Sequence, residues 1–502
     1  MEIKAKKSTN RFFSKVERIG NSLPHPIYIF IILSIIIMII SAIFSGKVIS
    51  VNNSGEPLVI KNLLNRTGII WILKNSVKNF INFPPLGMVL VTMLGIGLAE
   101  ETNFLKTLLK LCIIKAPMKL VTAIVIFSGI MGNVAGSAVF IIIPPLAAII
   151  FKSLGKHPIA GLAAGFIGVS GGLSANLLIT PTDVINAGIT DLSAKIIDPN
   201  YSVNPSANWY FMIVSTFLLT LVGTIILDKF IEPRLGKFED YHADDNIMNI
   251  TTSEKKALKI AGGVTLIYIF LLLITIVPTN GILRGENGSL VPSPFLDSMI
   301  PILTLLFFIP AFTYGKITKQ IKNKNDLIKL LSKSLGGLSS FVLLCFFAAQ
   351  FVSFFSYTNL GIWISITGAN YLKSINLFGL PVIIMFILFC TFTNFFIGSL
   401  SAKWTILAPI FVPMFMEMGL SPAFTQAAFR IADSVTNPIS PLEPFIPFII
   451  ITMQKYNRNY GLGTIISIMF PLSIGFLISW TTLLIIWYLF NFSLGPQAGI
   501  FL

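Results

Sequence analysis

The sequence predicts an all-α polytopic membrane protein with about nine transmembrane helices and two re-entrant hairpins, arranged as an inverted repeat. Of its 502 residues, 54% are hydrophobic and only 11% are charged, whereas a soluble domain carries about 25% charged residues. Apolar runs such as 27–44 and 464–489 have no polar face at helical spacing and reach the roughly 20 residues that a bilayer core requires. Four polar clusters within such runs predict the hairpins and the repeat.

The first repeat is predicted over residues 25–230. Its continuous helices are 27–45, 83–99 and 209–230. The run near 121–151 is interrupted at its centre by GNVAGSA and is flanked by lysines at both ends, which indicates a hairpin that enters and leaves on the cytoplasmic side. The following helix, 158–190, is broken at GGLSANLLITPTD.

Residues 231–257 form the predicted cytoplasmic connection to the second repeat, 258–491. The continuous helices of this repeat are 260–278, 298–314, 337–357 and 463–491. The run near 380–416 contains TNFFIGSLSAKW and is predicted as a second hairpin, entering from outside. Helix 422–453 is broken at ADSVTNPISP, and we place the tail 492–502 on the extracytoplasmic side.

The net charge of +15 indicates topology rather than nucleic-acid binding, because the basic residues are spread among short loops between apolar runs. We therefore expect no nucleic-acid partner and place the basic segment 1–24 in the cytoplasm. No small-residue cleavage site follows the first apolar run, so that run is read as an anchor. The three cysteines and three histidines are scattered through the sequence and form no disulfide or metal-binding pattern.

An equal spacing relates the two halves. Asn133 precedes Asn176 by 43 residues, and Asn394 precedes Asn437 by the same 43. Two hairpins that enter from opposite sides, each followed by a broken helix, predict an inverted repeat of the kind common in secondary transporters. The freed backbone groups and the four asparagines are candidates for a sodium site. The alternative is that the small and polar residues are only kinks and close-packing positions.

Ionisable residues near the breaks are functional candidates, because an unpaired charge in the membrane costs several kcal/mol. Arg430 and Asp433 lie three residues apart on one helical face and are expected to pair. Asp183 has no partner nearby in the sequence, and it is either a titrating or ion-coordinating group or a helix cap. Lys403 either faces substrate carboxylates or extends to water. Trp404 is either a flat surface for an aromatic substrate or an ordinary packed residue.

At these motifs the chain resembles the p-aminobenzoyl-glutamate transporter (AbgT) family over nearly its full length. The stretches that carry the resemblance are KHPIAGLAAGFIGVSGGLSANLLITPTD, DPNYSVNPSANWYFM, EPRLGKF, FFAAQF, IGSLSAKWTILAPIFVPMFM and SPAFTQAAFRIADSVTNPISPL. The resemblance implies a homodimer of nine-helix subunits in the inner membrane of a bacterium, with the N-terminus in the cytoplasm. It also implies functional roles for Asp183, Asn394, Ser401, Trp404, Arg430, Asp433 and Pro441.

Combining the breaks with the resemblance gives one set of candidate substrate- and ion-binding residues. The set is Asn133, Ser174, Asn176, Asp183, Asn394, Ser399, Ser401, Trp404, Arg430, Asp433, Asn437 and Pro441. The chain departs from the family pattern at three positions. Ser137 replaces an acidic residue, Ala432 replaces a glycine, and Glu443 stands where an uncharged residue is expected.

The resemblance implies transport of p-aminobenzoyl-glutamate-like folate catabolites, export of sulfonamide antimetabolites, or both. Such transport is driven by a gradient of H⁺ or Na⁺ and needs no cofactor. The main alternative is an ion-coupled dicarboxylate transporter of related architecture. A passive channel and an intramembrane aspartyl protease using Asp183 and Asp433 are further alternatives, although the Gly-x-Gly-Asp motif of such proteases is absent. The absence of a phosphate-binding Gly-Lys-Ser/Thr loop argues against ATP-driven transport.

Overall fold

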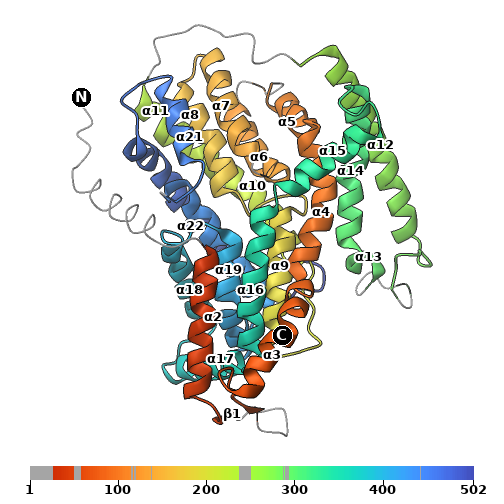
Figure 1. The fold of residues 1–502 in the computed structure, drawn as a ribbon. Helices are drawn as coiled ribbons and strands as arrows, with labels where there is room; N and C mark the ends of the chain where they lie inside the picture. Colours follow the sequence, from red (N-terminus) through yellow and green to blue (C-terminus); the bar gives the residue numbers. More distant parts are fainter. Residues whose placement is uncertain are drawn as a thin grey trace.

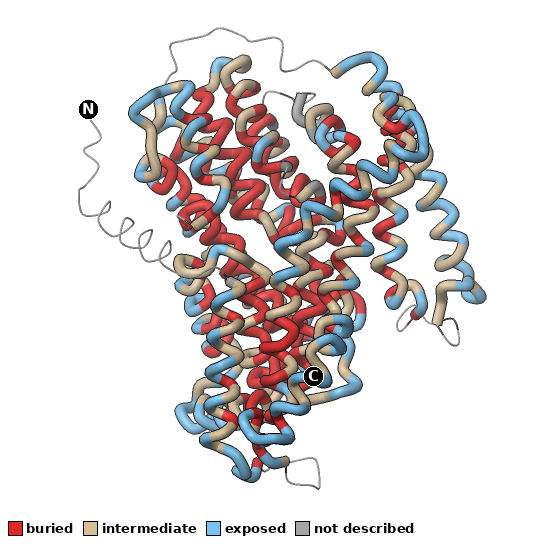
Figure 2. Tube along the Cα trace, viewed as in Figure 1, coloured by how far each residue is buried: buried red, intermediate tan, exposed pale blue. Residues whose placement is uncertain are grey.

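The computed structural model describes residues 26–49, 58–114, 117, 120–136, 138–236, 250–285, 288, 293–440 and 442–502. Within these ranges the chain is a helical bundle, and a short pairing of β1 (Val48–Ile49) with β2 (Leu58–Val59) is its only sheet (Figure 1). Buried residues concentrate where the central helices meet, and exposed apolar residues cover the periphery (Figure 2). This distribution is typical of a protein whose outer surface faces lipid.

Helices of the N-terminal half appear in the following order. They are α2 (Pro26–Ile43), α3 (Arg66–Ile81), α4 (Pro84–Glu101), α5 (Phe104–Ile114), α6 (Val121–Gly132), α7 (Ala138–Ser153), α8 (Pro158–Phe166), α9 (Pro181–Ala194), α10 (Trp209–Ile226) and α11 (Glu232–Leu235). Those of the C-terminal half are α12 (Thr252–Ile276), α13 (Pro294–Asp297), α14 (Met299–Ile317), α15 (Lys324–Gly336), α16 (Ser339–Tyr357), α17 (Leu360–Ser374), α18 (Leu380–Thr393), α19 (Leu400–Met416), α20 (Pro422–Thr436), α21 (Ile446–Gln454) and α22 (Leu462–Phe490).

Six helical stretches of the described chain are long and apolar enough to cross a membrane. They are Arg66–Glu101, Trp209–Leu235, Thr252–Ile276, Met299–Ile317, Ser339–Tyr357 and Leu462–Phe490. Helix α12 has the surface expected of a helix that faces lipid, because its apolar residues Leu266 and Phe270 are largely exposed. The shorter apolar helices include both predicted hairpins and the first part of the first broken helix.

The first interrupted run folds as two helices joined by a tight reversal. Helix α6 ends at Gly132, a 3₁₀ turn follows over Asn133–Ala135, and α7 begins at Ala138. Gly136 within the reversal has a φ of +62°, a conformation that disfavours a side chain. The chain therefore turns at the polar cluster that the sequence identifies, and the depth at which this turn lies in a membrane stays a prediction.

The first broken helix starts as α8 and continues as a π-helical segment over Ile167–Gly171. The chain is non-helical from there until α9 begins at Pro181, where proline suits the first helical position. Backbone groups in such a segment lack helical partners, so other residues must satisfy them. The break is therefore a place where polar groups from other elements must converge.

The second hairpin and broken helix have the same plan. Helices α18 and α19 are joined by residues 394–399, and α20 is followed by a 3₁₀ turn (Asn437–Ile439) before α21. A Cβ atom on Gly398 would lie 2.8 Å from the backbone oxygen of Leu442. This close approach brings the tip of the second hairpin against the second break.

Among the helices longer than four residues, α3, α5, α15 and α17 lie outside the continuous helices, hairpins and broken helices that the sequence predicts. Helix α17 contains Ser, Thr, Gly and Asn residues, so no uninterrupted apolar run marks it. Other expectations fall outside the described residues: the segment 1–24, most of the connection near 237–249, Ser137 and Pro441.

Candidate functional site

Helix α20 lies at the centre of the candidate site. Every residue of this helix is buried, although its sequence includes an arginine, an aspartate and several uncharged polar residues. It packs against α9, α18, α19 and α22. Because a buried polar group costs free energy unless it is paired, the polar side chains of α20 must find partners on these neighbours.

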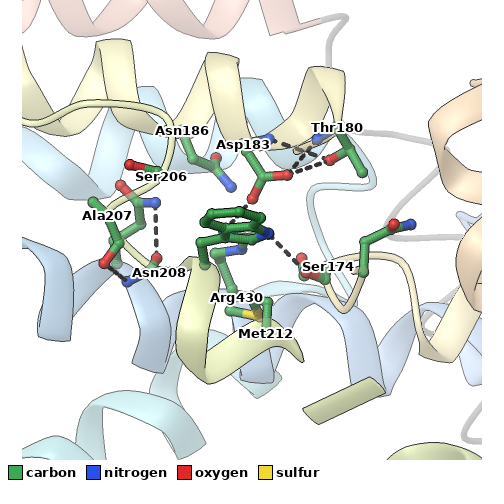
Figure 3. A network of polar contacts seen from close by, with 12 residues as sticks. Ser174, Thr180, Asp183, Asn186, Ser206, Ala207, Asn208, Met212 and Arg430 are labelled. Atoms are coloured by element: carbon green, nitrogen blue, oxygen red, sulfur yellow. Dashed lines mark hydrogen bonds and ion pairs between the residues drawn. The ribbon is translucent and has the colours of Figure 1, made fainter. Parts of the chain in front are cut away.

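The first pair joins the two broken helices (Figure 3). Nη1 of Arg430 lies 2.6 Å from Oδ1 of Asp183, and Nη2 donates to the backbone oxygen of Ser174 at 2.6 Å. Oδ2 of Asp183 accepts hydrogen bonds of 2.6 Å from both the backbone N–H and the hydroxyl of Thr180. Asp183 therefore caps the start of α9 and neutralises a buried arginine at the same time.

The second pair joins the second hairpin to the second broken helix. Nζ of Lys403 lies 2.6 Å from Oδ1 of Asp433, and both side chains are 1% exposed. The same ammonium donates to Oδ1 of Asn394. Lys403 is thus enclosed by protein in this conformation and does not extend to water. Within the described residues, Oδ2 of Asp433 has no hydrogen-bond partner.

The predicted pairing of Arg430 with Asp433 is wrong. Their spacing does place both on one face of α20, but each charge is paired with a residue of another element. Arg430 reaches α9 and Asp433 reaches α19. The two ion pairs therefore connect both α9 and α19 to α20, whereas a pair within α20 would connect neither.

The two asparagine pairs differ in how they bond. Nδ2 of Asn394 donates to Oδ1 of Asn437 at 2.9 Å and to the backbone oxygen of Asp433 at 2.8 Å. In the first repeat, Asn133 and Asn176 instead both donate to the backbone oxygen of Ile130, at 3.2 and 2.9 Å. Equal spacing therefore brings the two asparagines of each pair to the tip of their own hairpin. Within the described residues, a direct hydrogen bond joins Asn394 to Asn437, whereas Asn133 and Asn176 share an acceptor.

Three of the four amide oxygens already accept a hydrogen bond. Those of Asn176, Asn394 and Asn437 accept from the N–H of Leu178, the ammonium of Lys403 and the amide of Asn394. Oδ1 of Asn133 has no partner within the described residues. The sodium site stays a prediction. No group of three or more His, Cys, Asp or Glu in the described ranges could hold a metal ion.

Trp404 is fully buried against α20 and α9. Its ring stacks on Phe429 with centroids 4.4 Å apart and planes inclined by 20°, and its Nε1 donates to Oγ1 of Thr190 at 2.9 Å. In this conformation Phe429 covers one face of the indole. Contact between Trp404 and an aromatic substrate therefore stays a prediction, for a conformation that exposes the ring.

The remaining candidates lie around the breaks. Ser399 caps α19 by accepting from the N–H of Ala402, and its hydroxyl lies 3.3 Å from that of Ser401. The backbone N–H of Ser174 donates to the hydroxyl of Ser434. Glu443 is buried just beyond the second break. These residues share one region of the molecule, and no described contact assigns them a function.

Sequence reasoning missed several polar residues of this region. Thr180 could have been found, because Thr-x-x-Asp is a capping-box spacing. Thr190 and Gln426 have no such signal. The hydroxyl of Thr190 lies 2.7 Å from Oε1 of Gln426, and Nε2 of Gln426 donates to Oδ1 of Asn208 at 2.9 Å.

Replacing Thr190 by valine tests this network. The variant Thr190→Val leaves Nε1 of Trp404 and Oε1 of Gln426 buried without their partner, so we expect the free energy of unfolding to fall by about 1–3 kcal/mol. Thermal unfolding in detergent measures the change. The matched control is Thr482→Val, because the exposed Thr482 donates only within its own helix. Equal losses in the two variants would contradict the role given to Thr190.

Comparison with known proteins gives consistent results over the whole chain. Residues 11–502 match the AbgT transporter family. The p-aminobenzoyl-glutamate transport protein of Escherichia coli strain K12 is 39% identical over 497 residues, which is 98% of each chain.

Two solved structures are similar along nearly the full length. The YdaH transporter of Alcanivorax borkumensis has a TM-score of 0.90 and 34% identity, covering 94% of this chain and all of that one. Neisseria gonorrhoeae MtrF, whose structure is described as illuminating a class of antimetabolite efflux pumps, has a TM-score of 0.90 and 43% identity. That match covers 97% of this chain and all of MtrF. At these TM-scores and identities, the chain shares the fold of both proteins.

Proposed function

The chain belongs to the AbgT family of transporters, and from this premise we propose that it is an ion-coupled secondary transporter of the inner membrane. Its proposed substrates are p-aminobenzoyl-glutamate-like folate catabolites, sulfonamide antimetabolites for export, or both. The similarity to the p-aminobenzoyl-glutamate transport protein of E. coli and to MtrF, whose structure illuminates a class of antimetabolite efflux pumps, supports these two substrate classes. We propose that the transporter is a homodimer with a cytoplasmic N-terminus, as the family resemblance implies.

The proposal of ion coupling rests on the two buried ion pairs near the helix breaks. Asp183 and Asp433 are both buried, and each neutralises a cation on a different segment. Oδ2 of Asp433 has no partner within the described residues, so a proton or a sodium ion has an available acceptor there. Binding of such an ion would weaken the attraction between Asp433 and Lys403, because it neutralises the carboxylate. Ion binding could thereby loosen the contact between α19 and α20.

Reconstituted transport under separately imposed gradients tests this proposal. Purified protein in proteoliposomes is given radiolabelled p-aminobenzoyl-glutamate or a sulfonamide, with a proton gradient, a sodium gradient or neither. We expect accumulation against the substrate gradient with one of the two ions only. Transport that never exceeds equilibrium would indicate a passive channel. Competition by succinate-like acids, with no effect of aminobenzoyl compounds, would indicate the dicarboxylate alternative.

A further inference from the structure

Asn186 is a fully buried residue whose side chain has no described function. Its side chain lies on α9 with no exposed surface, and neither Oδ1 nor Nδ2 forms a hydrogen bond within the described residues. Most buried polar side chains in proteins are hydrogen-bonded, and an unpaired amide in the interior lowers stability. An apolar residue of similar size would be more stable there. The amide is therefore explained best by a partner that arrives during function.

The position of Asn186 on α9 indicates where that partner binds. Asp183, Asn186 and Thr190 recur at a spacing of three and then four residues, so they share one face of the helix. Asp183 pairs with Arg430, and Thr190 accepts the indole N–H of Trp404. Figure 3 shows Asp183 and Asn186 projecting from the same helix toward the side occupied by Arg430. Asn186 thus lies between the ion pair and the residue that binds the tryptophan.

Other polar atoms of the same region also lack partners. Nε of Arg430 and the hydroxyl of Ser174 are buried and form no hydrogen bond in the described chain, although other atoms of both residues bond to each other. An arginine Nε can only donate, a hydroxyl can donate and accept, and an asparagine amide offers one acceptor and two donors. The missing partner therefore presents acceptors and at least one donor, which excludes a bare metal cation as the sole occupant.

We propose that Asn186 recognises the acyl or sulfonyl amide group that the two proposed substrate classes share. This inference rests on the proposed function. In p-aminobenzoyl-glutamate the aminophenyl ring carries C(=O)–NH, and in a sulfonamide it carries S(=O)₂–NH. Oδ1 of Asn186 accepts from the N–H of this group, and Nδ2 is left to donate to a different acceptor of the ligand, because a trans amide holds its C=O on the side opposite its N–H. One side chain then accepts both classes despite their different charges and tails, with the aromatic ring directed toward Trp404. The contact forms in a conformation that admits substrate between the breaks.

The test compares two buried asparagines under the same substitution. Asn186→Leu removes an unpaired amide, whereas Asn208→Leu removes one that donates to the oxygen of Ala423 at 2.8 Å and accepts from Gln426 at 2.9 Å. We expect the thermal midpoint of Asn186→Leu to equal or exceed that of the wild type, and that of Asn208→Leu to fall. We also expect Asn186→Leu to bind p-aminobenzoyl-glutamate and a sulfonamide at least tenfold more weakly than the wild type. A clear fall in the midpoint of Asn186→Leu would assign the residue a structural role and overturn the proposal.

A ligand change tests the hydrogen bond itself. In the ester analogue of p-aminobenzoyl-glutamate, oxygen replaces the linking N–H, so the ligand can no longer donate to Asn186. The wild type is expected to bind the ester about tenfold more weakly than the amide, and Asn186→Leu to bind both equally. If Asn186→Leu prefers the amide over the ester by the same factor as the wild type, the inference is overturned. A wild type that binds neither aminobenzoyl compound nor sulfonamide contradicts the proposed function instead, so the two failures are distinguishable.

Discussion

Replacing Asp183 by alanine is expected to abolish gradient-driven transport and to lower the free energy of unfolding by about 3–5 kcal/mol, because one partner of a buried ion pair is lost. Arg430 is 1% exposed and would keep its charge in the protein interior without a carboxylate beside it. The variant also removes the acceptor that closes the capping box with Thr180. Thermal unfolding in detergent and uptake into proteoliposomes measure the two effects.

The conservative variant Asp183→Asn separates these effects. An asparagine retains one oxygen for Arg430 or Thr180, so we expect a smaller loss of stability than for alanine, together with loss of ion-driven transport. Asp191→Asn is the matched control on the same helix. Asp191 is also buried and pairs with Lys195 at 2.6 Å, but it lies away from the breaks, so transport should continue. Wild-type transport by Asp183→Asn would remove Asp183 from the coupling mechanism.

The positions of the breaks could be predicted because their physical cause is local. A glycine, an asparagine and hydroxyl residues within an apolar run supply flexible backbone and side-chain partners, which is what a chain reversal requires. The expected interruption at 132–138 coincides with the observed end of α6 and start of α7. The same reasoning applied to 393–404 identified the connection between α18 and α19. Capping residues set some of the other boundaries: α12 begins at Thr252, ahead of its apolar run, because Thr251 and Glu254 form a capping box.

The partners of the charged residues could not be predicted because their cause is tertiary. Spacing along α20 correctly places Arg430 and Asp433 on one face, but it contains no information about α9 or α19. Spacing along the sequence could therefore predict only a partner within the same helix. Asn186 was missed for a similar reason: an uncharged amide within a helical segment becomes informative only when its surroundings are known to contain no partner.

For variants of Lys403 and Asp433, we expect the effect on the free energy of unfolding to differ most from the effect on transport. Lys403→Met alone leaves Asp433 buried without its cation, and we expect the free energy of unfolding to fall by about 3–5 kcal/mol. The double variant Lys403→Met/Asp433→Leu removes both charges. Apolar replacement of a whole buried pair is often neutral or stabilising, so we expect the double variant to recover most of the lost stability. Thermal unfolding of the two variants in the same detergent measures this recovery.

Transport by the double variant then decides what the pair does. We expect it to fold without concentrating substrate under either ion gradient, because no carboxylate remains at that position to bind the coupling ion. Lys333→Met is the control for loss of a lysine: Lys333 pairs with Glu101 at 2.7 Å, but its side chain is 70% exposed, and salt and water screen such pairs. We expect that control to keep both its thermal midpoint and its transport. A double variant that still accumulates substrate would show that the pair only holds α19 against α20. Coupling of ion and substrate movement would then fall to Asp183, which among the described residues is the other buried carboxylate in an ion pair at the breaks.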